Sequence, residues 1–445
     1  MSDRYQQFTS TGFGRGLARR LGLPTPAPLR RFRPGDPVVA GPVLSGAAEG
    51  SRLGEAITGV LRAAGAEVRT EAAADARFSA LIFDATGITS SAQLEQLRAF
   101  FAPVIRQVDT CGRVLVLGTP PEETTDVAER VAQRSLEGFV RTVGKELKRG
   151  ATAQLVYASE GAEGSLGSTL EFLLSAKSAF VSAQVVRVGR AEVPEVDRDR
   201  PLRDEVALVT GASRGIGESI AETLARDGAH VICLDVPAQG ADLANVANRI
   251  GGSALQLDIT AEDAPRRLVE HVTERHDGLD VVVHNAGITR DKTLGRMDEG
   301  RWGSVLAVNL TAQERINEAL LAEGSPLRRG GRLIGVASIS GIAGNVGQSN
   351  YATSKAGVIG LVQGLAPLAA RRGATINAVA PGFIETKMTA AVPLLIREAG
   401  RRMSSLSQGG LPVDVAETIA WYANPGSAGV NGNVVRVCGQ SLLGA

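Results

Sequence analysis

The sequence lacks the features that mark several large classes of protein. Its three cysteines, Cys111, Cys233 and Cys438, are widely spaced and do not have the spacing of metal ligands. They predict reduced, buried thiols, with neither a disulfide framework nor a metal site. No apolar run approaches the roughly 20 residues of a membrane span, and the first residues lack the apolar core of a signal peptide. The expected location is therefore the cytoplasm.

Net charge and aromatic content are also low. The net charge is +1, and aromatic residues make up 4% of the chain. Such a chain has no overall field that attracts nucleic acid, and no basic face with interleaved aromatic residues is present. We therefore expect neither nucleic acid nor a membrane span among its interactions. The 445 residues, 44% of them apolar, instead predict a globular protein of two domains.

Composition divides the chain into four parts. Residues 1–36 are rich in arginine and proline and predict an arm, whereas residues 37–190 predict a first α/β domain. Residues 191–205 are rich in proline and charge, have no apolar periodicity and predict a linker. Residues 206–445 predict a second domain, which carries the chemistry discussed below.

The second domain alternates short apolar runs with helical patterns. The runs occupy residues 206–210, 230–235, 254–258, 279–287, 331–338 and 375–382. Strands that are apolar throughout are buried on both faces, and helices between them imply parallel pairing. The pattern therefore predicts an α/β fold with a doubly wound parallel sheet of the Rossmann type.

A glycine-rich loop, TGASRGIG, joins the first run to the following helix. Gly211, Gly215 and Gly217 let the backbone bend sharply and approach a pyrophosphate closely. The N-terminus of the helix adds free N–H groups and a partial positive charge. The preceding strand, the following helix and the acid that ends the next strand, Asp235, together predict a dinucleotide site and make a ligand-free turn the weaker reading.

Two residues favour different dinucleotides. Asp235 can accept hydrogen bonds from the adenosine ribose and would repel a 2′-phosphate, which favours NAD. Arg214 favours NADP, because an arginine in this loop can bind that phosphate. We give Asp235 more weight, because like charges in a partly dry site cost more free energy than a mobile arginine gains. NADH is the expected cofactor, and NADPH is the less favoured one.

Tyr351 and Lys355 lie four residues apart, on one face of a predicted helix. The pair could belong to an ordinary surface helix, where it would contribute little. The alternative is a phenol that transfers its proton. Its ordinary pKa of ~10 is high for this work at neutral pH, and a neighbouring ammonium is expected to lower it.

The glycine loop, the HNAG sequence at 284–287, Ser338, the Tyr351–Lys355 pair and the PG sequence at 381–382 resemble the short-chain dehydrogenase/reductase family. The stretches GNVGQSNYATSKAGVIG and NAVAPGFIETKMT most resemble 3-oxoacyl-[acyl-carrier-protein] reductases, and the chain length resembles their two-domain, high-molecular-weight form. The resemblance implies reduction of 3-oxoacyl thioesters of acyl carrier protein or CoA in fatty acid metabolism, and Asp235 makes NADH the expected reductant. A 3-hydroxyacyl-CoA dehydrogenase and a non-catalytic dinucleotide-binding scaffold remain alternatives.

The resemblance also implies residue roles. Tyr351 would protonate the substrate oxygen, Lys355 would hold the nicotinamide ribose, Ser338 would steady the carbonyl, and Asn309 would hold a water that resupplies protons. The expected cofactor contacts, besides Tyr351 and Lys355, are Gly211, Ser213, Arg214, Gly215, Ile216, Gly217, Asp235, Asp258, Ile259, Asn285, Ala286, Gly287, Pro381, Gly382, Ile384 and Thr386.

Three further expectations concern the surroundings of the site. Residues 385–411 are expected to form a mobile substrate lid. The lid arginines, Arg397, Arg401 and Arg402, are expected to meet either a phosphate or solvent. The arginines that dock the carrier protein in the resembled family fall near Arg329 and Arg372.

Four pairs of segments indicate an internal repeat. The pairs are FDATGIT (83–89) with VHNAGIT (283–289), GRVLVLGT (112–119) with GRLIGVAS (331–338), GATAQLV (150–156) with GATINAV (373–379), and SAFVSAQVVRV (178–188) with SAGVNGNVVRV (427–437). Residues 37–190 are thus predicted to be a degenerate, shortened Rossmann or flavodoxin-like domain. Glu129 and Gln133 stand in the places of the tyrosine and lysine, and Thr119 in that of the serine, so we expect this domain to be non-catalytic.

The repeat leads to a prediction about assembly. Reductases of the resembled family commonly form tetramers, and a repeat that takes the place of a partner subunit would let two long chains correspond to four short ones. We therefore expect a homodimer, with twice the chain mass in light scattering. A stable tetramer, or a monomer with full activity, would contradict this.

Overall fold

The computed structural model describes residues 4–390 and 393–441. The first three residues of the expected arm and the last four of the expected catalytic domain lie outside these ranges. The chain forms two compact units. The N-terminal unit comprises Met1–Val193, Ala390–Gly410 and Val437–Leu442, and the C-terminal unit comprises Pro194–Thr389, Leu411–Arg436 and Leu443–Ala445.

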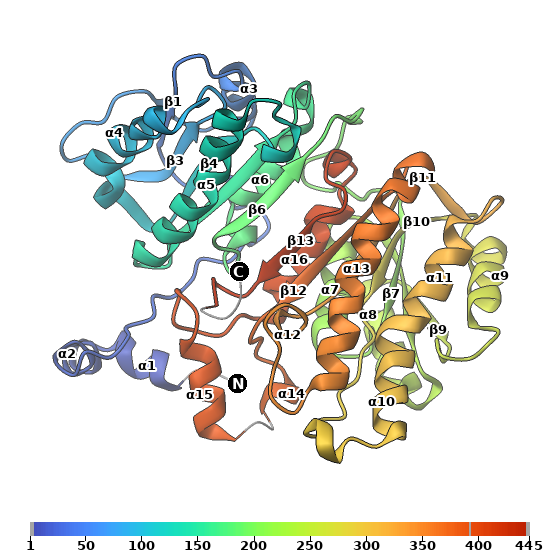
Figure 1. Ribbon diagram of the computed structural model, residues 1–445. Coiled ribbons are helices and arrows are strands. Elements are labelled where there is room, and N and C mark those ends of the chain that lie inside the picture. The colour runs from blue at the N-terminus through green and yellow to red at the C-terminus, as the bar shows by residue number, and fades with distance from the viewer. Residues whose placement is uncertain (1–3, 391–392, 442–445) are drawn as a thin grey trace. The chain divides into compact units, whose positions relative to one another are not determined.

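The N-terminal unit is built on a six-stranded sheet in the order β2-β1-β3-β4-β5-β6 (Figure 1). Its strands are β1 (Val43–Ala47), β2 (Val68–Arg69), β3 (Phe78–Asp84), β4 (Val108–Gly118), β5 (Thr152–Ala158) and β6 (Gln184–Val188). All the pairs are parallel. The order of the first five strands is that of flavodoxin-like folds, as the prediction of a shortened Rossmann or flavodoxin-like domain requires.

Helices connect these strands because the segments between them carry apolar residues at helical spacing. The helices of the unit are α1 (Arg4–Ser10), α2 (Gly12–Arg20), α3 (Gly54–Ala63), α4 (Glu95–Val104), α5 (Val127–Glu146), α6 (Gly167–Leu174) and α15 (Leu394–Arg402). In α5, Leu136 and Val140 are buried four residues apart and pack in one core with Val114 and Val116 of β4.

The C-terminal unit holds a seven-stranded sheet in the order β13-β12-β11-β10-β7-β8-β9. Its strands are β7 (Val206–Thr210), β8 (His230–Asp235), β9 (Ser253–Gln256), β10 (Leu279–His284), β11 (Leu327–Val336), β12 (Thr375–Pro381) and β13 (Val434–Val437). Numbered from β7, six neighbouring strands follow the Rossmann order 3-2-1-4-5-6, with β13 added as a seventh. The predicted doubly wound fold is confirmed.

The helices of this unit separate successive strands and cover the sheet (Figure 1). They are α7 (Gly215–Arg226), α8 (Gly240–Ile250), α9 (Ala264–His276), α10 (Glu299–Leu306), α11 (Ala312–Leu321), α12 (Ile339–Ala343), α13 (Ser349–Arg371), α14 (Lys387–Ala390) and α16 (Pro412–Ala423). In the part of the chain that the structure describes, none of the helices combines the length and the apolar character that crossing a bilayer requires.

The strand bounds differ from the expected runs mainly where polar residues take part in pairing. The first two runs coincide with β7 and β8, but β9 ends at Gln256, so Asp258 belongs to the following loop. Strand β11 begins at Leu327, four residues before the apolar run, because Leu327 pairs with Leu279 across an irregularity in the register. Backbone pairing there extends over residues whose side chains give no apolar signal.

The four repeated segments lie on corresponding strands of the two sheets. The pairs are β3 with β10, β4 with β11, β5 with β12, and β6 with β13, and in both sheets these strands are consecutive neighbours. The irregularity between β10 and β11 has its counterpart between β3 and β4. Cys111 and Gly330, which directly precede the second pair of segments, both adopt a left-handed backbone, with φ of 56° and 83°.

An amide side chain closes the edge of both sheets in the same way. Gln154 of β5 donates to the carbonyl of Val181 (2.5 Å) and accepts from the first N–H of β6 (3.1 Å). Asn377 of β12 donates to the carbonyl of Val430 (2.8 Å) and accepts from the N–H of Asn433 (2.9 Å). These contacts, here called the amide clamp, support the internal repeat beyond strand order alone.

Candidate active site

The predicted glycine loop follows β7 and opens α7. Gly211 has a φ of 68°, and a Cβ there would lie 2.9 Å from the Cα of Ala286. A Cβ on Gly217 would lie 2.0 Å from the carbonyl oxygen of Gly211. Gly215 has a φ of 64°, in the left-handed region that favours glycine. The glycines therefore allow the start of α7 to pack directly against the ends of β7 and β10.

A hydrogen-bonded link that the sequence did not reveal joins these two strand ends. The Thr210 hydroxyl accepts from the N–H groups of Asn285 and Ala286, both at 3.0 Å. The Asn285 amide donates to the carbonyls of Thr210 (3.0 Å) and Gly211 (3.1 Å). Asn285 thus holds the glycine loop in place. The sequence alone does not show that a threonine at the end of a buried strand links two strand ends.

The acid predicted to select the dinucleotide lies beside the glycine loop. The Asp235 carboxylate accepts from the N–H of Ser213 (3.2 Å) and from that of Val236 (2.9 Å). Arg214 directs its guanidinium to Gln239 (3.2 Å). The bare glycine backbone and the N-terminus of α7 fit a pyrophosphate, and Asp235 at the end of β8 fits a ribose. The residues present are therefore compatible with a bound dinucleotide.

The remaining expected cofactor contacts follow strand ends of the same sheet. Asp258 is exposed and accepts from the N–H and hydroxyl of Thr260, whereas the neighbouring Ile259 is buried. Ile216 lies in the first turn of α7, and Gly287 follows β10. The residues that follow or end β12 include Pro381, Gly382, the buried Ile384 and Thr386.

The residues predicted to be catalytic also meet at the carboxyl ends of the strands. Ser338 follows β11 as the N-cap of α12, and its Oγ accepts from the N–H of Ser340 (3.1 Å). Tyr351 and Lys355 are the third and seventh residues of α13. The Ser338 hydroxyl lies close enough to the Tyr351 phenol to lower its pKa. The structure thus brings serine and phenol together, as the resemblance implies.

The expected effect of Lys355 on the phenol is wrong for this structure. The Lys355 ammonium donates to the carbonyl of Val336 (2.7 Å) and lies 5.7 Å from the centroid of the Tyr351 ring. Burial raises the pKa of Tyr351, and only the hydrogen bond with Ser338 acts in the opposite direction. Burial also lowers the pKa of Lys355 to about 8. Desolvation is therefore the largest effect on the pKa of both groups.

Asn309 lies in a π-helical turn (Ala307–Thr311) between α10 and α11, a distortion that is frequent at functional sites. Its amide is fully buried, accepts from the N–H of Ile288 (2.9 Å) and donates to the Ile288 carbonyl (3.1 Å) and the Ser354 hydroxyl (3.1 Å). These bonds position the loop after β10. A Cβ on Gly287 would lie 3.4 Å from both Asn309 Oδ1 and Lys355 Nζ.

Two positioning residues were missed in the sequence. Asn350 is fully buried and donates to the carbonyls of Arg290 (3.2 Å) and Arg301 (3.1 Å), which fixes the first turn of α13. Ser354 donates to the carbonyl of Tyr351 (2.8 Å) while it accepts from Asn309. Both lie in the NYATSK stretch, but the sequence does not show which groups these polar side chains bind.

Arg401 and Arg402 of the expected lid pair within the protein, whereas the docking role of Arg329 and Arg372 stays a prediction. Arg401 is 5% exposed and pairs with Glu398, and Arg402 pairs with the same carboxylate (3.0 Å), so neither forms a solvated basic face. Arg329 lies near the start of β11, and Arg372 follows the end of α13. These two therefore lie at the edge of the sheet opposite to Ser338 and Tyr351.

In the N-terminal unit, a glutamine occupies the position that corresponds to Lys355. Gln133 is the seventh residue of α5, as Lys355 is of α13, and it is fully buried. Its amide donates to the carbonyls of Ala85 (2.9 Å) and Ile88 (2.8 Å) and accepts from the N–H of Thr119 (2.9 Å). An uncharged cross-link thus replaces the ammonium.

A carboxylate also occupies the start of α3, where the C-terminal unit has its glycine loop. Asp84 is 1% exposed and accepts from the N–H of Leu53 (2.7 Å), the residue before α3. Its other oxygen accepts from the N–H of Thr86 (3.0 Å). A negative charge of the protein itself therefore stands where a phosphate would need to bind.

The carboxyl edge of the second sheet combines a dinucleotide loop with a half-buried phenol beside a serine and a lysine. This arrangement is that of a nicotinamide-dependent oxidoreductase. A family model described as Enoyl-(Acyl carrier protein) reductase matches residues 211–439. The chain belongs to the short-chain dehydrogenase/reductase family.

Curated relatives match the same half of the chain. The 3-oxoacyl-[acyl-carrier-protein] reductase FabG of Vibrio cholerae is 42% identical over 242 residues, which cover 54% of this chain and 99% of the relative. The protein of the same name from Pseudomonas aeruginosa is 42% identical over 245 residues, with 54% and 99% covered. That from Escherichia coli is 38% identical over 239 residues, with 54% and 98% covered. The chain is thus similar to complete reductases through its C-terminal unit.

His284 ends β10. Its side chain is 2% exposed, and its Nε2 lies 2.8 Å from the side-chain oxygen Oδ1 of Asn317. Burial lowers the pKa of His284 to about 4. The imidazole is therefore neutral at physiological pH and acts as a hydrogen-bonding core residue.

Acidification should destabilise the C-terminal unit through His284. The pKa of His284 is about 4 in the folded protein and 6.5 in the unfolded protein. The contribution of the neutral imidazole to stability is therefore fully present above pH 6.5 and is lost as the pH falls towards 4. Between pH 7 and 4.5 the free energy of unfolding in urea should fall by about 2.5 kcal/mol more in the wild type than in His284→Asn. Other titrating groups are common to both proteins and cancel. Parallel pH profiles would contradict the prediction.

Proposed function

We propose that the protein reduces 3-oxoacyl thioesters of acyl carrier protein or CoA to 3-hydroxyacyl thioesters in fatty acid biosynthesis, with NADH as the reductant. The observation that carries the proposal is the half-buried Tyr351 phenol with the Ser338 hydroxyl beside it and the Lys355 ammonium near its ring. The names of the relatives, which act on 3-oxoacyl groups bound to acyl carrier protein, support the substrate class.

The chemistry divides between the cofactor and the side chains. When bound, the reduced nicotinamide supplies a hydride to the carbonyl carbon. Tyr351 gives its phenolic proton to the carbonyl oxygen, and the Ser338 hydroxyl donates a hydrogen bond to the same oxygen. Because burial raises the pKa of Tyr351, the phenol is protonated at neutral pH, as a proton donor must be.

Lys355 and Asn309 support this proton transfer. The pKa of about 8 keeps the Lys355 amine charged at neutral pH, and near enough to neutrality to release a proton. Asn309 fixes the loop that carries Gly287. Because Gly287 has no side chain, space remains between the Asn309 amide and the Lys355 ammonium. A water held there would return a proton to Tyr351 through Lys355 after each turnover.

Three other activities are weighed against this one. Oxidation of a 3-hydroxyacyl-CoA would use the same Ser338, Tyr351 and Lys355 in the reverse direction, so the ratios of the metabolites decide between this reaction and the reduction. A scaffold that only binds dinucleotide has no use for Ser338, Tyr351 and Lys355 together. Enoyl reduction is suggested by the description of the family model, but its hydride acceptor is a carbon–carbon double bond, whereas the serine and phenol suit a carbonyl oxygen.

The main test is oxidation of NADH in the presence of acetoacetyl-CoA, followed at 340 nm. We expect turnover by the wild type and a kcat lower by roughly 10²–10⁴ in Tyr351→Phe, which keeps the ring but has no proton to give. Fluorescence titration should show unchanged NADH affinity in this variant.

Crotonyl-CoA serves as the parallel substrate for enoyl reduction. If crotonyl-CoA is turned over and acetoacetyl-CoA is not, the activity is enoyl reduction and the proposed carbonyl reduction is wrong. NADH binding without turnover of either substrate would leave acetoacetyl-acyl carrier protein as the substrate to add. Failure with that thioester as well would favour the scaffold.

The choice of NADH rests on Asp235. Its carboxylate is held against the glycine loop through Ser213, close to where an adenosine ribose is expected. A 2′-phosphate would meet this charge, whereas Arg214, turned to Gln239, would attract it. The fixed carboxylate supports NADH more strongly than the exposed arginine supports NADPH, because a mobile group loses side-chain entropy on binding.

Removal of this charge should reverse the preference. We expect Asp235→Asn, which keeps the shape and an acceptor oxygen, to raise kcat/KM for NADPH relative to NADH by at least about tenfold, since like charges in contact cost more than 1.4 kcal/mol at low dielectric. Arg214→Gln is the matched control and should weaken NADPH use only. A wild type that already prefers NADPH would overturn the cofactor assignment but not the reaction.

We further propose that the N-terminal unit neither binds dinucleotide nor catalyses. Asp84 at the start of α3 and Gln133 in the place of the lysine support this. The homodimer and the cytosolic location stay predictions.

A further inference from the structure

Large exposed apolar side chains gather in one part of the chain. Among the described residues, fifteen such side chains are exposed, and five of them lie between residues 8 and 23 of the arm. These five, here called the apolar stripe, are Phe8, Phe13, Leu17, Leu21 and Leu23, with exposed fractions of 41%, 78%, 39%, 63% and 46%. Single exposed apolar residues are ordinary on a protein surface, but such a group marks a site of interaction.

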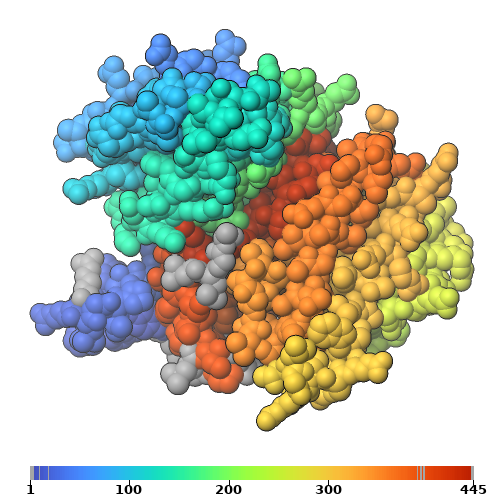
Figure 2. All heavy atoms as spheres, viewed as in Figure 1, coloured from blue at the N-terminus to red at the C-terminus, as the bar shows by residue number. Residues whose placement is uncertain are grey.

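The apolar stripe belongs to α1, α2 and the residues up to Leu23, here called the hairpin. The hydroxyl of Thr11 donates to the carbonyl of Phe8 (2.7 Å) and accepts from the N–H of Gly14 (3.0 Å). A Cβ on Gly14 would lie 2.0 Å from the carbonyl oxygen of Phe8, so the close approach of the two helices requires this glycine. Figure 1 shows the helices side by side, and in Figure 2 their atoms, in dark blue, lie at the surface.

Other side chains of the hairpin are buried or bound within the N-terminal unit. Ala18 is 1% exposed. The Gln6 amide donates to the side-chain oxygen of Gln408 (3.0 Å), and the Arg402 guanidinium lies 4.6 Å from the centroid of the Tyr5 ring. Both partners belong to the same compact unit. Because the hairpin is already held in place, it loses less conformational entropy when the apolar stripe binds a partner.

Apolar and basic residues occupy different sides of α2. Phe13, Leu17 and Leu21 follow at intervals of four residues, and the N–H of Leu21 still donates to the carbonyl of Leu17 (3.1 Å). Helical geometry places these three within an arc of about 80°. Arg15 and Arg20 are exposed and lie outside this arc. Such a separation is typical of helices that lie in the boundary between lipid head groups and acyl chains.

The charge of the arm differs from that of the rest of the chain. Residues 1–36 contain seven arginines, two aspartates and neither lysine nor glutamate, which gives a formal charge of +5 in a chain whose total is +1. The other residues therefore carry a net charge of −4. An anionic lipid surface attracts the arm and repels the remainder, so the field turns the arm toward the lipid.

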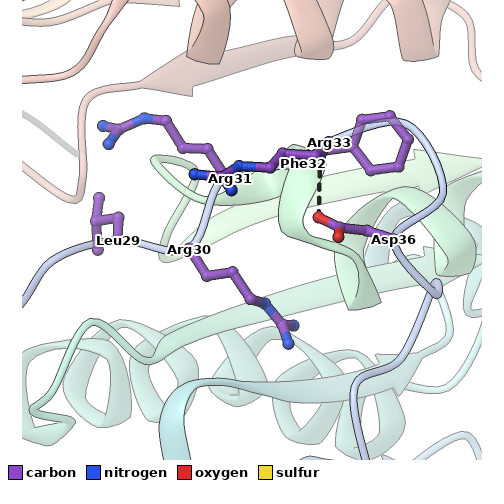
Figure 3. A pocket seen from close by; sticks show the side chains of 6 residues that line it. All are labelled: Leu29, Arg30, Arg31, Phe32, Arg33 and Asp36. Atoms are coloured by element: carbon purple, nitrogen blue, oxygen red, sulfur yellow. Dashed lines mark hydrogen bonds between the residues drawn. The ribbon is translucent and has the colours of Figure 1, made fainter.

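The second basic stretch of the arm adds to this charge without forming a site for one anion. Residues 29–33, with Asp36, border a hollow of about 430 Å³. Figure 3 shows the guanidinium groups of Arg30 and Arg31 pointing in different directions, so they do not converge on a single phosphate. Attraction to many head groups at once does not require such convergence.

A second copy of the chain is the other partner to weigh for the apolar stripe. Contact between the stripes of two copies would bring together two arms of formal charge +5. Like charges at such short range repel each other, and the repulsion acts against the gain from apolar contact. An anionic bilayer meets the same stripe with the opposite charge. Charge complementarity therefore favours lipid over self-association.

We propose that the hairpin docks on the surface of an anionic lipid bilayer, with the apolar stripe at the boundary of the acyl chains and the arginines of the arm at the head groups. The protein then binds the bilayer reversibly and does not span it. The inference depends on the N-terminal unit alone, so it stands or falls independently of the proposed reaction.

The test is co-sedimentation of the full-length protein with vesicles of phosphatidylcholine, either pure or with about one quarter phosphatidylglycerol, in about 0.1 M salt. We expect partitioning into the anionic vesicles to be at least about tenfold stronger than into the neutral ones. The double variant Phe13→Gln, Leu21→Gln should bind the anionic vesicles at least about tenfold more weakly. The matched control is Val127→Gln, at an apolar residue of α5 that is 74% exposed, and it should bind like the wild type.

A charge variant keeps the test valid if the double variant does not fold. Arg20→Gln leaves the apolar stripe intact and should weaken binding to the anionic vesicles about fivefold. Absence of binding by the wild type would overturn the proposal, as would unchanged binding by Arg20→Gln or by a folded double variant. A halved mass of the double variant in light scattering would show that the stripe joins two copies, and would also overturn it.

Discussion

The close approach of β7, β10 and α7 is the constraint on which the site depends. It requires that no side chain stand at Gly211 or Gly217, because a Cβ at either would meet backbone atoms at 2.9 or 2.0 Å. The Asn285 amide then bonds two carbonyls at the end of β7. Without this contact the helix N-terminus and the loop before Asn309 would not share an edge of the sheet, and neither pyrophosphate nor phenol would be correctly placed.

The second determinant of the site is the loss of water around its ionisable groups. Burial moves the pKa of Tyr351 up from its ordinary 10.0 and that of Lys355 down from 10.5 to about 8, so the order of the two values is reversed. Transfer of a proton from the Lys355 ammonium to a Tyr351 phenolate is therefore favourable, whereas between the same groups in water it is slightly unfavourable. Burial therefore costs solvation free energy but also favours this proton transfer. The position of Lys355 matters more for the transfer than the effect of its charge on the phenol.

The sequence predicted the fold more completely than the site. Continuous apolar runs determined the strands, and the glycine spacing with Asp235 determined the dinucleotide edge, because both depend on local chemistry. The Thr210–Asn285 link and the bonds of Asn350 and Ser354 were not predicted, since they join residues far apart in the chain. The pKa of Tyr351 was expected to fall, because sequence spacing reveals a neighbouring lysine but not the extent of burial. The pairing of Arg401 and Arg402 with Glu398 was missed for the same reason.

The amide clamp occurs twice in one chain, which creates an ambiguity for folding. Strands β5 and β6 close with the same bonding pattern as β12 and β13, so each could accept the wrong neighbour while the chain collapses. The clamps differ in reach, because the glutamine at position 154 has one methylene more than the asparagine at 377. In a mispaired sheet the amide would no longer meet both main-chain groups, and buried donors or acceptors would be left without partners. A single methylene thus helps each half of the chain to complete its own sheet.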